Sequence, residues 1–119
     1  MGSENFRKKH MGDYLAEDGH FVKSRGEMLI DNWLYHHNYR HAYERKIPNI
    51  KQDVYPDFYI PEGDCYIEYW GLEGNDNYES VIEWKKKIYK KQSIKVVEIR
   101  NKDIKRISDV LPDKLGNYL

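Results

Sequence analysis

The sequence predicts a small α/β domain in which a mixed central sheet of about four strands is flanked by helices. Its 119 residues suit one compact domain with a single core. Apolar residues recur at helical spacing in two segments and at strand spacing in four. The elements follow in the order αβββαβα, which is typical of helices packed on a sheet.

The composition narrows the class of protein. Hydrophobic residues make up 39%, with 11 Tyr and 3 Trp, so aromatic side chains must provide much of the core. The formal net charge is zero, which excludes a globally basic nucleic-acid binder. The single cysteine, Cys65, excludes an intramolecular disulfide and a cysteine-rich zinc site. The single cysteine favours a reducing, intracellular setting, so we expect a cytoplasmic protein. No membrane partner is expected, because no apolar run has the length of a membrane span.

The domain is expected to cover residues 23–119. Residues 1–22 form a polar N-terminal segment, which we expect to be flexible or left over from expression. The first helix begins at Ser24, where "SRGE" is a capping box: Ser24 accepts from the backbone of Glu27, and Glu27 reaches back to Ser24. Glu27 lies one turn before Ile30 on the apolar face of this helix.

Four segments read as strands. The first spans roughly Arg40 to Arg45, the second is "VYPDFYI", and the third is "CYIEYW" after the turn sequence "PEGD". The fourth, "IKVVEI", is almost continuously apolar, so we expect it to be central in the sheet. One or two short helices are expected in "NKDIKRISDVLPDKL".

Two carboxylates interrupt the apolar strands. Asp57 and Glu68 flank the "PEGD" turn, so a hairpin would bring them close together. Two carboxylates in a dry hairpin repel each other unless something positive sits between them. Each acid could instead form a buried salt bridge or point outward from an exposed face of the sheet.

The second helix, from about Tyr78 to Gln92, directs a lysine toward the protein. At about 100° per residue its apolar positions form one stripe, and Lys85 lies near the centre of this stripe. Lys86 lies to one side and Lys87 points away. The alternative is that Lys85 threads its methylenes along the edge of the core and surfaces at the rim.

These pieces resemble the PD-(D/E)xK nuclease superfamily. The resemblance is carried by "PDF", by "IEYW" with its acid eleven residues after Asp57, and by the earlier helical Glu27. In wording, "PDFYIP", "YIEYWGL" and "WKKKIY" look most like the nuclease-like domain of helicase IV-type helicases and its stand-alone relatives. They are more distantly similar to very-short-patch-repair and Holliday-junction-resolving endonucleases.

The resemblance implies a restriction-endonuclease-like core and a site for Mg²⁺, with Mn²⁺ as a substitute. It implies that Asp57 and Glu68 bind the metal, with the backbone carbonyl of Tyr69 as a further ligand. Glu27 would contribute directly or through water. The catalytic residues would be Glu27, Asp57, Glu68 and Lys85.

One position departs from the superfamily pattern, because Trp70 stands where a lysine usually follows the second acid. Either cleavage has been lost, or the lysine comes from the following helix, as it does in some members. Lys85 is then the expected replacement and Lys86 the alternative. Trp70 either packs under this helix or serves as a wall of the site on which a base stacks.

The charges are divided along the chain. Residues 52–80 contain eight acidic residues and no Lys or Arg, whereas residues 81–106 contain ten basic and three acidic ones. This division suits a metal site beside a surface that grips a polyanion, although ordinary solvated faces would look the same. The expected contacts to DNA phosphates are Lys23, Arg25, Lys86, Lys90 and Lys91.

The expected function is therefore that of a Mg²⁺-dependent deoxyribonuclease. It would be a DNA endonuclease of repair or recombination, selective for DNA structure or weakly selective for sequence. A homodimer and a helicase or other targeting domain are the further partners that the resemblance implies. The alternatives are an inactive nucleic-acid-binding module of the same fold and, more weakly, a protein-interaction domain.

The histidines are not expected to bind zinc. His37 and His41 have a spacing of four residues, but a strand is predicted to begin between them, so they would not share a helical face. We expect the histidines to be neutral surface or partly buried residues.

Overall fold

The computed structural model describes residues 14–71 and 76–119. No helix within these residues is long and apolar enough to cross a membrane. With η for a 3-10 helix, the elements are β1 (Tyr14–Leu15), β2 (Phe21–Val22), α2 (Arg25–His36), β3 (Ala42–Tyr43), β4 (Phe58–Ile60), η1 (Pro61–Gly63), β5 (Cys65–Trp70), α3 (Asp76–Lys91), β6 (Val96–Arg100), η2 (Asn101–Arg106) and α4 (Ile107–Leu115).

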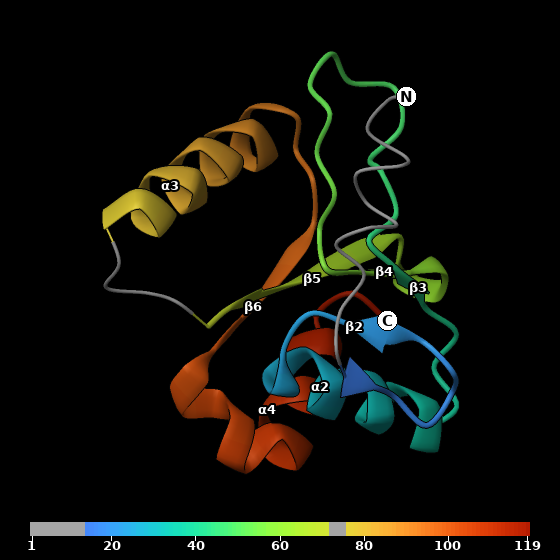
Figure 1. Ribbon diagram of the computed structural model, residues 1–119. Coiled ribbons are helices and arrows are strands. Elements are labelled where there is room, and N and C mark those ends of the chain that lie inside the picture. Colours follow the sequence, from blue (N-terminus) through green and yellow to red (C-terminus); the bar gives the residue numbers. More distant parts are fainter. Residues whose placement is uncertain (1–13, 72–75) are drawn as a thin grey trace.

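The main sheet has four strands in the order β3-β4-β5-β6. β3, β4 and β5 pair antiparallel, and β6 joins β5 in parallel through a crossover that contains α3. Helices α2 and α4 lie on one side of the sheet and α3 on the other (Figure 1). The predicted fold class, a mixed α/β sheet flanked by helices in the order αβββαβα, is confirmed.

The two faces of the sheet have separate cores because side chains alternate along each strand. In β5, Ile67 belongs to the cluster that includes α2 and α4, whereas Tyr66 and Trp70 belong to the cluster that includes α3. Glu68 has the same parity as Tyr66 and Trp70, so its carboxylate lies on the α3 face. That face therefore brings Glu68 next to α3.

The last strand corrects one expectation. β6 is at the edge of the described sheet, not in its centre, because it pairs only with β5 among the described strands. β6 is apolar because other parts of the protein cover both of its faces. Val97 and Ile99 pack in the cluster of α2 and α4, and Val96 packs in the cluster of α3.

The strands β3 and β4 are shorter than the sequence predicts. The backbone of Glu44 is left-handed, with φ of +53°, and this ends β3 after Tyr43. Pro56 has no N–H to donate to a ladder, and β4 begins only at Phe58. Residues 44–57 form a long connection between the two strands, which projects from the sheet in Figure 1.

Part of the N-terminal segment assigned to residues 1–22 is structured. β1 and β2 form an antiparallel hairpin that pairs Tyr14 with Val22. Ala16 and Val22 are buried. The hairpin therefore extends the ordered part of the domain before Lys23. The rest of the expected segment, residues 1–13, lies outside the described residues.

Candidate active site

Asp57 and Glu68 lie side by side across the β4–β5 hairpin, as the sequence predicts. The register pairs Phe58 with Ile67, which makes Asp57 and Glu68 the next pair along the ladder. The backbone N–H of Asp57 donates to Glu68 Oε1 at 3.2 Å, and the N–H of Tyr69 donates to Asp57 Oδ2 at 2.6 Å. Each carboxylate is thus held by the backbone of the neighbouring strand.

Lys85 reaches this hairpin from α3. Its Nζ lies 3.0 Å from Glu68 Oε2, and its side chain is 19% exposed, whereas Glu68 is 1% exposed. The Tyr89 hydroxyl, one turn later on α3, donates to the same carboxylate oxygen. The prediction that Lys85 points inward is therefore confirmed, while its catalytic role stays a prediction.

The neighbouring lysine is directed elsewhere. Lys86 Nζ lies 3.2 Å from Glu98 Oε1, on β6, and the indole N–H of Trp70 donates to the same oxygen at 2.8 Å. Trp70 is 1% exposed and packs under α3, so it offers no surface for stacking on a base. Of the two candidate lysines, Lys85 is the one that contacts Glu68.

Glu27 enters from the first turn of α2. Ser24 caps the helix by accepting from the N–H of Glu27 at 3.1 Å, as predicted. The return bond differs from the prediction, because Glu27 Oε1 accepts from the N–H of Lys23 at 3.0 Å instead of Ser24. The same oxygen accepts from the Tyr43 hydroxyl at 2.7 Å. The Glu27 side chain is thereby fixed at the edge of the hairpin.

The carboxylates act on one another electrostatically. Burial raises the pKa of Asp57 well above its usual range, and the nearby carboxylates of Glu68 and Glu27 raise it further. The Tyr69 N–H and Lys85 oppose this shift only in part. Burial likewise raises the pKa of Glu27. Three carboxylates face one ammonium group, so the site has a deficit of positive charge.

A hard divalent cation fits this donor set. Mg²⁺ prefers oxygen ligands, keeps several waters and is commonly held by one or two carboxylates. Asp57 and Glu68 provide such a pair, and Glu27 is near enough to affect the pKa of Asp57. A cation here would supply the missing positive charge. We refer below to Glu27, Asp57, Glu68 and Lys85 as the carboxylate site.

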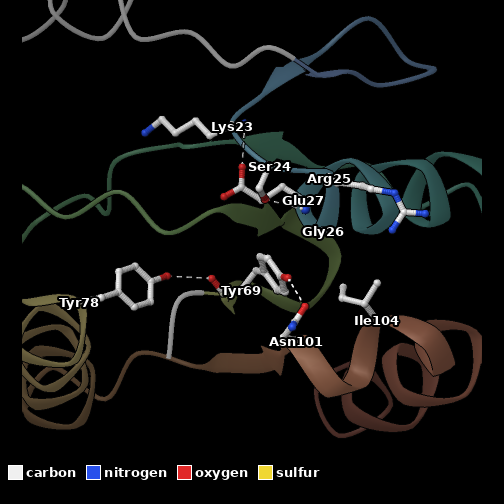
Figure 2. A pocket seen from close by; sticks show the side chains of 10 residues that line it. Lys23, Ser24, Arg25, Gly26, Glu27, Tyr69, Tyr78, Asn101 and Ile104 are labelled. Atoms are coloured by element: carbon white, nitrogen blue, oxygen red, sulfur yellow. Dashed lines mark hydrogen bonds between the residues drawn. The ribbon is translucent and has the colours of Figure 1, made fainter. Parts of the chain in front are cut away.

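The carbonyl of Tyr69, expected as a further ligand, accepts from the Tyr78 hydroxyl at 3.2 Å. This bond joins two residues that line a pocket of about 580 Å³ (Figure 2). Gly26 also lines the pocket and packs closely on Tyr69, since an added Cβ would lie only 2.3 Å from the Tyr69 ring. The lining residues are Lys23, Ser24, Arg25, Gly26, Glu27, Tyr69, Gly71, Tyr78, Asn101 and Ile104.

The five residues expected to bind DNA lie in three places. Lys23 and Arg25 are exposed and extend to opposite sides of Glu27 at the pocket (Figure 2). Lys90 and Lys91 are exposed in the last turn of α3 and do not line this pocket. Lys86 is tied to Glu98. Of the five residues, Lys23 and Arg25 line the pocket beside Glu27, where Lys23 Nζ lies 2.6 Å from Glu44 Oε2.

The sequence analysis missed the tyrosines that position the carboxylates. Tyr43 binds Glu27 and Tyr89 binds Glu68, and burial together with these carboxylates raises the pKa of both phenols. A signal for Tyr89 was available, because it lies four residues after Lys85 and so shares its helical face. Tyr43 gave no such signal, since its contact with Glu27 joins two elements distant in sequence.

Three comparisons with known proteins, against family models, curated proteins and solved structures, found no match.

Proposed function

We propose that this chain is a metal-dependent deoxyribonuclease of the PD-(D/E)xK type. Asp57 and Glu68 would hold Mg²⁺, and Lys85 would replace the lysine that the motif usually carries at the position of Trp70. The observation that carries this proposal is the 3.0 Å contact between Lys85 and Glu68. A lysine from a separate element meets the second acid of the motif.

The chemistry follows from the side chains present. When bound, the metal would act as a Lewis acid and lower the pKa of a bound water. Lys85 is positioned to orient a water or a phosphate oxygen beside Glu68, and to stabilise negative charge that develops on the phosphate. Tyr43 and Tyr89 hold Glu27 and Glu68 in place by their hydroxyls.

The proposed substrate is DNA, gripped through its phosphates. Lys23 and Arg25 flank the pocket beside Glu27, and cationic side chains there would neutralise the backbone on its way to the carboxylates. Phosphate contacts carry little sequence information, so the proposed selectivity is for DNA structure, with at most weak sequence preference. A homodimer, or a helicase or other targeting partner, would supply further specificity.

A cleavage assay tests this function. Labelled single-stranded, duplex, flapped and four-way-junction DNA is incubated with the protein across a titration of Mg²⁺ and of Mn²⁺. We expect metal-dependent cutting that Asp57→Ala lowers by at least about 10³-fold. Asp53→Ala is the matched control, since Asp53 makes only an exposed ion pair with Lys46. Cutting that survives in Asp57→Ala would refute the proposed site.

A second candidate is an inactive DNA-binding module. Its support is that the polar groups of the site already bind each other: Lys85 and Tyr89 bind Glu68, and Tyr78 binds the Tyr69 carbonyl. This module would bind DNA with the same metal-independent affinity in the parent and in Asp57→Ala. It would cut none of the four substrates at any metal concentration.

A further inference from the structure

A second group of charged side chains lies apart from the carboxylate site. Asp18 and His20 come from the turn between β1 and β2, Asp31 from α2, and His41 from the segment before β3. One ligand atom of each lies within 4.8 Å of the others. We call these four residues the histidine cluster.

Each histidine of the cluster contacts both carboxylates through one ring nitrogen, and Asp31 uses a different oxygen for each histidine. His20 Nδ1 lies 3.0 Å from Asp18 Oδ2 and 2.9 Å from Asp31 Oδ2. His41 Nε2 lies 2.9 Å from Asp18 Oδ2 and 3.0 Å from Asp31 Oδ1. Two imidazole nitrogens and two carboxylates thus converge within 4.8 Å, a donor group of the kind that can hold one cation.

The far side of His41 supports this interpretation. Its Nδ1 lies 2.8 Å from the carbonyl oxygen of Tyr39, which can only accept, so Nδ1 carries a proton. Nε2 faces the two carboxylates: it carries a proton and donates to them when no ion is bound, and it offers a lone pair when an ion replaces that proton. A backbone carbonyl that fixes the tautomer in this way is the usual outer partner of a metal-binding histidine.

Because the histidine cluster is largely buried, leaving its two carboxylates without a positive partner would be costly. Asp31 is fully buried and His41 nearly so, while His20 is 37% exposed and borders the solvent. Two carboxylates held against the same nitrogens require positive charge between them. The exposed edge of His20 gives an ion a path into the cluster.

We propose that the histidine cluster binds one zinc ion. Two imidazole nitrogens and two carboxylate oxygens are ligands that zinc accepts, and together they complete a tetrahedral set. The edge of such a tetrahedron is about 3.3 Å for ordinary zinc–ligand distances, and the four ligand atoms, which lie within 4.8 Å of one another, would close to this spacing on binding. The ion would pin the β1–β2 hairpin to α2.

The proposed zinc would also brace the carboxylate site. The His41 ring packs edge-on against Phe58, with centroids 6.0 Å apart, and Phe58 directly follows Asp57. The His20 ring stacks on Tyr43, whose hydroxyl binds Glu27. Zinc binding itself, however, depends on no residue of the carboxylate site.

The test uses the full chain without an affinity tag, after treatment with EDTA. Zinc chloride is titrated by calorimetry, and Co²⁺ replaces zinc for a visible spectrum. We expect one ion per chain, the intense absorption of tetrahedral cobalt, and a rise in Tm of about 5 °C or more. No zinc uptake by the parent with a Kd below about 100 µM, or an octahedral cobalt spectrum, would overturn the proposal.

Variants locate the ion. His20→Gln alters the most exposed ligand and should weaken zinc binding by at least about 100-fold. His36→Gln is the matched control, because His36 also contacts a carboxylate, Glu17, but lies outside the cluster. Equal zinc affinity in His20→Gln and the parent would refute the site. Asp57→Ala should keep its zinc, which separates this proposal from the proposed nuclease activity.

Discussion

The carboxylate site and the histidine cluster both bury acidic side chains, but they balance the charge differently. The carboxylate site sets three acids against one lysine, and burial with like charges raises the pKa of Asp57. In the histidine cluster each acid faces two imidazole rings. The first arrangement leaves a deficit of positive charge that a substrate-associated cation can fill. The second is closed on itself and suits a structural role.

This comparison shows that burial alone does not identify a catalytic group. Asp31 is as buried as Glu68, yet its partners lock a turn, a helix and a strand segment together. Glu68 instead contacts a lysine from α3, the helix that also contributes Tyr78 to the pocket beside Glu27. What distinguishes the two regions is the balance of the surrounding charge.

Among the variants that test this comparison, Lys85→Ala is expected to have the largest effect. Lys85→Ala should keep metal binding but lower the cleavage rate by about 10²-fold, because the ammonium group that stabilises the transition-state charge is lost. Single-turnover cleavage and a Mn²⁺ titration measure the two properties separately. Lys86→Ala and Lys87→Ala are the controls. If Lys86→Ala loses turnover and Lys85→Ala does not, the assignment of the lysine is wrong.

Asp31 should have its main effect on stability. In the presence of EDTA, Asp31→Asn should lower the free energy of unfolding by about 2 kcal/mol, since it weakens charge-assisted hydrogen bonds to two histidines. Urea denaturation measures this change. Asp109→Asn is the control because Asp109 makes only an exposed ion pair with Arg106. Equal losses in both variants would contradict the structural role of the histidine cluster.

Asp57 should behave in the opposite way. Asp57→Asn should raise the free energy of unfolding by about 1 kcal/mol at pH 7 without metal, because it removes a carboxylate from a site with too much negative charge. The folded-state pKa of Asp57 lies above its ordinary value of 3.8. The parent therefore loses stability as the pH rises from 3.8 through the folded-state pKa.

Urea denaturation of the parent and of Asp57→Asn across this pH range tests whether the substitution raises or lowers the free energy of unfolding. The gain of Asp57→Asn should be complete above the folded-state pKa of Asp57 and vanish below pH 3.8, where both side chains are neutral. A variant that is less stable than the parent at pH 7 would show that the site tolerates its charges without a cation.

The smallest effect is expected from a change at Tyr43, which contacts both the carboxylate site and the histidine cluster. Tyr43→Phe removes the hydroxyl that binds Glu27 but keeps the ring that stacks on His20. Cleavage should fall by about 3-fold to 10-fold while zinc affinity stays unchanged, as expected for the loss of one hydrogen bond. A parallel loss of zinc affinity would mean that the two regions are coupled more tightly than these contacts indicate.

The sequence by itself determined the order of the elements, the cap at Ser24, the pairing of Asp57 with Glu68, and the inward direction of Lys85. All of these follow from local rules: helical periodicity, strand alternation and the register of a hairpin closed by a short turn. The resemblance then named a chemistry for the residues that these rules had brought together.

Only the tertiary structure decided which distant segments meet. It placed β6 at the edge of the described sheet, turned Tyr43 onto Glu27, and gathered the histidine cluster from three separate segments of the chain. No periodicity connects these residues, because their contacts depend on how the hairpin, α2 and the sheet pack on one another. Packing of this kind depends on many weak contacts between residues that are distant in the sequence. Local sequence patterns therefore do not predict it.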